Sequence, residues 1–118
     1  TADPKYRHEG SFVNLLGHKP SDKEEKLFSC NCQVTKKTPP AFLWHTADDT
    51  CVPVKNSLFY AEALSEKGIP FELHVYPEGG HGLSTCDKQS HNKVPKAAGY
   101  DKVWLDSAKK WLNLTFNL

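Results

Sequence analysis

Residues 39–83 read PPAFLWHTADDTCVPVKNSLFYAEALSEKGIPFELHVYPEGGHGL. Two short apolar runs, Ala41–His45 and Phe71–Tyr76, flank a segment with helical spacing over about Val54–Lys67. Strand, helix and strand joined by short connections are typical of a βαβ unit with parallel strands and a right-handed crossover. The stretch therefore predicts an α/β fold, and the apolar character of Ala41–His45 predicts a strand that is buried on both faces.

The boundaries of these three elements are marked by turn residues. Pro39 and Pro40 exclude helix and cannot donate to a strand ladder, so they end a linker that begins near Thr35. Gly68 lies where a left-handed C-cap is needed, and Pro70 prevents the helix from continuing.

The flanking regions of the chain are less regular. Residues 1–20 are polar and predicted to be irregular, and Ser21 with Glu24 has the form of a capping box that opens a short helix. Residues 84–98 predict a long surface loop. A final helix from Tyr100 carries apolar positions at helical spacing, which indicate core packing. We expect residues 1–118 to form a single partial domain.

Composition excludes several kinds of partner. The 15 basic and 14 acidic residues leave a formal charge of +1, which gives no electrostatic footprint for nucleic acid or for an anionic membrane. No apolar run approaches the roughly 20 residues of a membrane span, and no signal peptide opens the chain. We therefore expect neither nucleic acid nor a membrane as partner, and a cytoplasmic location.

The cysteines and histidines do not show metal-binding patterns. Cys30 and Cys32 are not spaced as C-x-x-C, and no second pair completes a tetrahedral set. Free thiols are the simpler interpretation, although a Cys51–Cys86 contact is an alternative. The histidines show no H-E-x-x-H spacing. No metal or cofactor is predicted.

Two candidate catalytic residues follow the two predicted strands. Asp48 comes after the first strand, and His81 follows the second in the glycine-rich turn 77–82. Ligands of parallel α/β sheets bind at the carboxyl ends of the strands, so the Asp48 carboxylate is expected to accept a hydrogen bond from Nδ1 of His81. Asp49 is expected to face solvent or to support the loop. Taken singly, an Asp-Asp pair is also typical of a solvated turn or of a helix N-cap. A histidine between glycines is likewise typical of a plain turn.

These segments together resemble a known family. The chain is similar to the carboxyl-terminal half of α/β-hydrolase-fold serine esterases of the acetylxylan-esterase and carbohydrate-esterase kind, and more distantly to the prolyl oligopeptidase group. The resemblance rests on residues 39–49, 52–57, 68–82 and the N-terminal segment 8–21. It implies parallel strands with flanking helices, Asp48 as triad acid and His81 as general base. The implied substrate is an ester, either a small molecule or an acetylated carbohydrate.

One member of the implied triad is missing from the sequence. None of the serines stands in the G-x-S-x-G elbow of these enzymes, and the HGGG-type oxyanion segment is also absent. The expectation is a C-terminal fragment that is inactive alone and needs the amino-terminal half of the protein or self-association as partner. A peptidase fragment of the prolyl oligopeptidase type, or an inactive structural remnant, are the alternatives.

Overall fold

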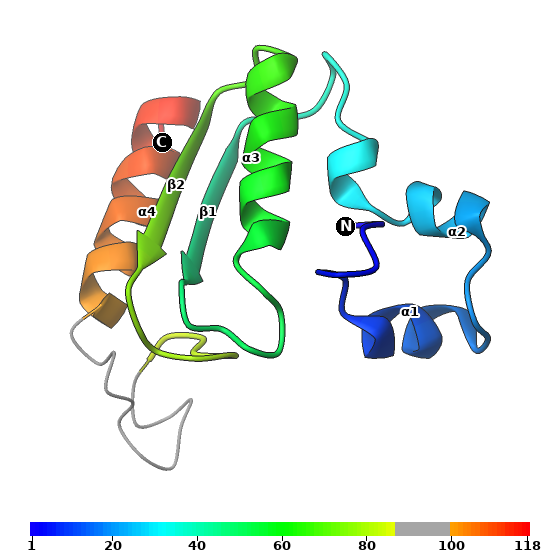
Figure 1. Ribbon diagram of the computed structural model, residues 1–118. Coiled ribbons are helices and arrows are strands. Elements are labelled where there is room, and N and C mark those ends of the chain that lie inside the picture. Colours follow the sequence, from blue (N-terminus) through cyan, green and yellow to red (C-terminus); the bar gives the residue numbers. More distant parts are fainter. Residues whose placement is uncertain (87–99) are drawn as a thin grey trace.

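The computed structural model describes residues 1–86 and 100–118, and Figure 1 shows a small parallel sheet between helices. The strands are β1 (Ala41–Thr46) and β2 (Phe71–Tyr76), joined by helix α3 (Lys55–Glu66). They pair in parallel from Ala41 opposite Phe71 to Thr46 opposite Tyr76. The predicted strand–helix–strand unit is confirmed, with β1 one residue longer than expected.

Helices cover both faces of the sheet. Helix α4 (Tyr100–Phe116) lies on one face, where Trp104 stacks on Trp44 of β1 with ring centroids 5.0 Å apart. Helix α3 lies on the other face, and its fully buried Leu64 packs with Val34 and Ile69 beneath Leu43 of β1. β1 is therefore covered on both faces, as predicted, although most of its side chains are only partly buried.

The turn that ends α3 follows the sequence prediction. Gly68 adopts a left-handed backbone with φ of 67°, and the Ile69 N–H donates to the carbonyl of Leu64 at 2.9 Å. This backbone conformation favours glycine, and the chain then passes through Pro70 directly into β2.

The amino-terminal region contains more helix than the sequence indicated. Residues 1–20 were expected to be irregular, but α1 (Glu9–Leu16) forms within them and ends at Gly17, whose φ is 73°. The prediction was wrong because α1 has only eight residues and buries only Phe12, so its formation depends on tertiary packing more than on local propensity. Helix α2 (Asp22–Leu27) begins with the predicted Ser21–Glu24 capping box, and a 3-10 turn, η1 (Cys30–Cys32), follows.

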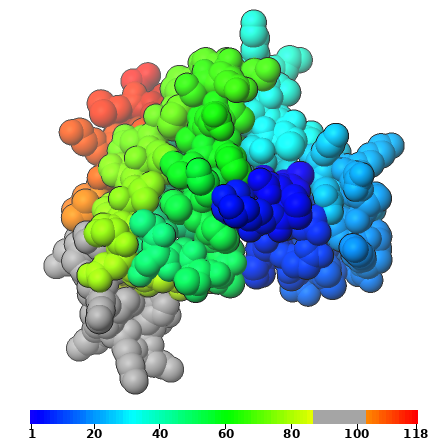
Figure 2. Space-filling view, viewed as in Figure 1, coloured from blue at the N-terminus to red at the C-terminus, as the bar shows by residue number. Residues whose placement is uncertain are grey.

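The N-terminal residues pack against α3 rather than against the strands. The Asn56 side chain donates to the Tyr6 carbonyl at 2.8 Å, and the Tyr6 ring meets Phe59 edge-on at 5.7 Å. Figure 2 shows this segment lying over the middle of the molecule. The predicted loop 84–98 lies largely outside the described residues. Cys30, Cys32 and Cys51 are exposed free thiols, whereas Cys86 is buried.

Candidate active site

The loops that follow β1 and β2 leave the sheet at the same edge and are bonded to each other. The Ala47 N–H donates to the Tyr76 carbonyl at 2.7 Å, which continues the strand pairing by one step. The buried Thr46 hydroxyl donates to the Gly80 carbonyl at 2.6 Å. These bonds fix the histidine loop against the end of β1, at the place where parallel sheets bind ligands.

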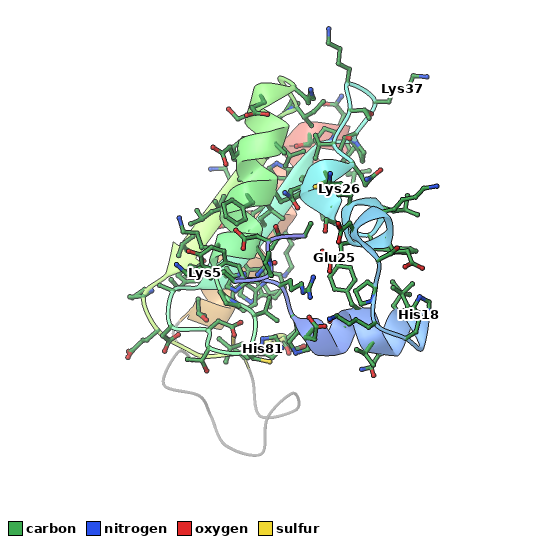
Figure 3. The ribbon with its side chains drawn as sticks, turned by 45° about the vertical axis from the view of Figure 1, so that its right-hand side comes forward. Lys5, His18, Glu25, Lys26, Lys37 and His81 are labelled. Atoms are coloured by element: carbon green, nitrogen blue, oxygen red, sulfur yellow. The ribbon has the colours of Figure 1, made fainter. Side chains whose placement is uncertain are left out.

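His81 is presented to solvent by unusual backbone geometry. Gly79, Gly80 and Gly82 have φ of 146°, 71° and 71°, values that side-chain-bearing residues rarely adopt. A Cβ at Gly80 or Gly82 would meet nothing within 4 Å, so the glycines serve the backbone conformation and not the packing. The His81 side chain is left 50% exposed at the edge of the sheet (Figure 3).

Asp49 is the carboxylate that meets His81. Its Oδ2 lies 2.9 Å from Nδ1 of His81, and its side chain is 5% exposed. Its Oδ1 accepts from the backbone N–H groups of Cys51 at 2.9 Å and Val52 at 2.8 Å. Because a carboxylate accepts hydrogen bonds, the proton of His81 sits on Nδ1 and leaves Nε2 as the basic nitrogen.

Asp48 occupies a different position from the one expected. Its two oxygens accept from the backbone N–H groups of Gly79 at 3.1 Å and Gly80 at 2.9 Å. The expected Asp48–His81 contact is therefore replaced by an Asp49–His81 contact. Of the two expectations for Asp49, exposure to solvent was wrong, whereas support of the loop is confirmed by its bonds to Cys51 and Val52. The reason is the turn after β1, which binds Oδ1 of Asp49 to two N–H groups and thereby directs Oδ2 toward the imidazole.

The sequence permits this arrangement without singling it out, because Asp48 and Asp49 each stand two positions before a non-proline residue. Asp49 stands two residues before Cys51 and three before Val52, and Val52 directly precedes Pro53. An aspartate that bonds the backbone two residues on forms an Asx turn, and such a turn fixes the side chain close to the chain. In the structure Asp49 forms this turn, whereas Asp48 reaches the neighbouring loop.

Both aspartates are held in their ionised forms. Burial alone opposes ionisation of Asp49, but the N–H of Val52, the imidazole of His81 and the N–H of Cys51 outweigh it and hold its pKa below the usual value. The N–H groups of Gly80 and Gly79 likewise lower the pKa of Asp48. The site therefore carries two carboxylates at neutral pH, only one of which touches the histidine.

A hollow of about 190 Å³ opens beside this pair. Trp44, Asp49, His81 and Leu83 are among the residues that line it. Its walls combine an aromatic ring and an aliphatic side chain with the acid–histidine pair, as small-molecule sites commonly do.

Metal chemistry has no donor set in the part of the chain that the structure describes. Within residues 1–86 and 100–118, no three or more His, Cys, Asp or Glu side chains gather in a way that could hold a metal ion. None of the helices in those residues is both long and apolar enough to cross a membrane.

A parallel sheet with helices on both faces, and an acid–histidine pair at the carboxyl ends of its strands, defines part of an α/β-hydrolase fold. Residues 14–107 match the sequence model of the prolyl oligopeptidase family. The chain belongs to this family. Its relatives are hydrolases, which makes hydrolysis the reaction class of the group.

Individual relatives include enzymes of xylan breakdown. The chain is 46% identical over 85 residues to endo-1,4-beta-xylanase B of Butyrivibrio fibrisolvens, covering 72% of this chain and 13% of the relative. It is 35% identical over 86 residues to an acetylxylan esterase of Xylanibacter ruminicola, covering 69% and 18%.

The solved structures give the same assignment of fold. An acetyl ester-xyloside bifunctional hydrolase from Caldicellulosiruptor lactoaceticus superimposes with a TM-score of 0.76 at 43% identity, covering 92% of this chain and 37% of that one. The chain thus spans less than a fifth of these two curated relatives and about a third of the solved structure.

Proposed function

We propose that this chain is the carboxyl-terminal part of a serine carboxylic-ester hydrolase, in which Asp49 and His81 supply the acid and the base of a Ser-His-Asp triad. The observation that carries this proposal is the 2.9 Å bond between Oδ2 of Asp49 and Nδ1 of His81 at the carboxyl ends of parallel strands. The serine, which this chain lacks in any G-x-S-x-G context, comes from another part of the polypeptide.

In the proposed reaction His81 moves protons while Asp49 stays ionised. Nε2 of His81 takes the proton of the serine hydroxyl as its oxygen attacks the ester carbonyl, and returns it to the departing alcohol. Water then attacks the acyl-serine and gives one proton to Nε2, which passes it to the departing serine oxygen as the carboxylic acid is released. In each half-reaction the Asp49 carboxylate stabilises the imidazolium that forms transiently.

The proposed substrate class is an acetyl ester on a sugar. The names of the acetylxylan esterase and of the acetyl ester-xyloside bifunctional hydrolase refer to acetyl esters. The names of the acetylxylan esterase and of the xylanase refer to xylan. The hollow beside His81 places Trp44 and Leu83 next to the base, and an aromatic ring suits the apolar face of a sugar or acetyl group.

The proposal is tested in a chimera, in which the amino-terminal part of a related hydrolase is joined to this chain. In the chimera, this chain replaces the corresponding carboxyl-terminal part of the Caldicellulosiruptor lactoaceticus hydrolase, which it matches over 92% of its own length. We expect hydrolysis of p-nitrophenyl acetate that His81→Ala lowers by about a thousandfold or more. His18→Ala, at an exposed histidine that lies apart from His81 (Figure 3), is the matched control and leaves the rate unchanged.

A folded chimera that hydrolyses nothing favours the alternative of an inactive structural remnant. A chimera whose activity survives His81→Ala contradicts the proposed role of this histidine.

A peptidase is the second candidate, because the matching family takes its name from an oligopeptidase. The same acid and base serve both reactions, so the two candidates differ only in the leaving group and its pocket. Comparing kcat/KM for p-nitrophenyl acetate and for a peptide p-nitroanilide with the same chimera separates them.

A further inference from the structure

A second histidine lies close to the candidate acid. His45 is in β1, four residues before Asp49, and its side chain is 13% exposed. Its Nε2 lies 3.3 Å from Oδ2 of Asp49, the same oxygen that His81 contacts at 2.9 Å. One carboxylate oxygen thus has two imidazoles within 3.3 Å, of which His81 forms the hydrogen bond.

The partners of His45 define which of its nitrogens carries the proton. Nε2 also lies 2.8 Å from the carbonyl oxygen of Val52, and a carbonyl can only accept. The proton is therefore on Nε2 and is donated to the Val52 carbonyl, while Oδ2 of Asp49 lies 3.3 Å from the same nitrogen. Nδ1 lies 2.8 Å from the hydroxyl of Ser57 in α3, which donates to it when the ring is neutral.

We propose that His45 is a positioning residue of the active site, which holds the Asp49 carboxylate in register with His81 through its Nε2–H bond to Val52 and its 3.3 Å approach to Oδ2. The proposal rests on the proposed triad role of Asp49 and His81. The backbone N–H groups of Cys51 and Val52 fix Oδ1, and the imidazole of His45, 3.3 Å from Oδ2, limits the movement of that oxygen.

This restraint matters at the moment when charge develops. When His81 gains its second proton, the benefit of the carboxylate depends on Oδ2 remaining at hydrogen-bond distance from Nδ1. A donor anchored to α3 through Ser57 and to the acid loop through Val52 keeps that oxygen in place before the reaction begins.

His45 is not a second base. Both of its ring nitrogens are engaged and its side chain is largely buried, whereas His81 is half exposed and has Nε2 available for a substrate. Its effect on the reaction therefore passes through Asp49.

The chain offers a matched pair of substitutions at this position. The amide nitrogen of glutamine reaches the place of Nε2, while that of asparagine reaches only the place of Nδ1. His45→Gln thus keeps a donor toward Asp49, and His45→Asn removes it while keeping a partner for Ser57. His18→Asn, on the exposed surface, controls for loss of a histidine as such.

The first measurement uses the 118-residue chain and does not depend on activity. Nitrogen-15 NMR of the histidine rings is expected to place the proton of His45 on Nε2 and that of His81 on Nδ1. In His45→Asn, exchange of the His81 ring proton with water is expected to accelerate about tenfold, because the carboxylate that protects it moves. His45→Gln is expected to restore slow exchange.

The second measurement uses the chimera described above. His45→Asn is expected to lower kcat by about 10-fold to 100-fold with KM changed less than about twofold, because the restraint acts only as charge develops. His45→Gln is expected to recover kcat to within about threefold of the parent. Thermal unfolding of both variants accompanies the kinetics, so that a loss of folding is recognised.

The outcomes separate this proposal from the triad itself. If His81→Ala abolishes activity while His45→Asn and His45→Gln behave alike, the triad stands and the positioning role of His45 is overturned. If His45→Asn lowers only the unfolding temperature, and leaves both kcat and the exchange of the His81 proton unchanged, His45 is a structural anchor and the proposal fails. If the chimera is inactive, the exchange measurement decides alone.

Discussion

Adjacent aspartates at the end of β1 have different partners, and the difference assigns them different tasks. Asp49 is buried and bonds the His81 ring, whereas Asp48 is exposed and binds two N–H groups of the glycine loop. The Asp49 bond affects the charge and the tautomer of the His81 imidazole. The Asp48 bonds affect the conformation of the loop that carries His81. Substitution of the two residues should therefore have unequal consequences.

The first prediction compares Asp49→Asn with Asp48→Asn in the chimera. Asp49→Asn should lower kcat by about a thousandfold or more, because it removes the charge that stabilises the imidazolium and permits the wrong tautomer of His81. Asp48→Asn keeps an acceptor for one N–H group and should lower kcat by only about tenfold through loosening of the loop. Steady-state kinetics on p-nitrophenyl acetate measures both.

Equal losses in the two variants, or a larger loss for Asp48→Asn, would return the acid role to Asp48. Circular dichroism of each variant provides the control for folding.

For individual residues, the sequence indicates that an aspartate and a histidine form the site, but it does not indicate which aspartate pairs with the histidine. His81 stands out because glycines surround it, and those glycines do adopt positive φ. The choice between the two aspartates depends on which carboxylate the turn binds to its own backbone, a difference of one residue in a loop. Strand and helix periodicity carry no information about such a loop.

The elements themselves follow local patterns closely where the pattern is strong. Strand β2 (Phe71–Tyr76) coincides with its predicted range, and α3 begins and ends within one residue of the range expected. Helix α1 was missed because its eight residues bury one side chain, so tertiary packing and the Gly17 cap decide its formation.

The capping box of α2 offers a prediction about acid. The hydroxyl and N–H of Ser21, together with His18, lower the pKa of Glu24 from 4.5 to about 2. A carboxylate with a lowered folded pKa stabilises the fold above its unfolded pKa, and the contribution is lost as the pH falls through the folded value. The start of α2 should therefore weaken between pH 4.5 and about 2.

Carbon-13 NMR of the Glu24 carboxyl group in the 118-residue chain measures this directly. The expected midpoint is about 2, and Ser21→Ala should move it toward 4.5 because it removes the largest cause of the shift. A midpoint near 4.5 in the unsubstituted chain would contradict the capping geometry.

At the scale of the whole molecule, the described part of the chain forms a small sheet with uncovered edges. Its two strands pair only with each other among residues 1–86 and 100–118, so each has one edge without a strand partner there. Apolar side chains on β2 are also exposed, including Phe71 at 37% and Val75 at 43%. Unpaired strand edges beside apolar surface promote pairing with another chain.

The last prediction is that the 118-residue chain associates with itself in solution. Sheets of two strands are marginally stable alone, so burial of the open edges by a second copy should stabilise the fold as concentration rises. Sedimentation velocity across a wide concentration range should show a shift from monomer to larger species, with the unfolding temperature rising in parallel.

Val75→Lys should weaken the association, because it places a charge on the exposed face of β2. Ser65→Lys adds the same charge at an exposed position of α3 and should leave the association unchanged. A chain that stays monomeric and unfolds cooperatively at every concentration would show that α3 and α4 alone suffice to stabilise this sheet, and the expected need for a partner would then be wrong.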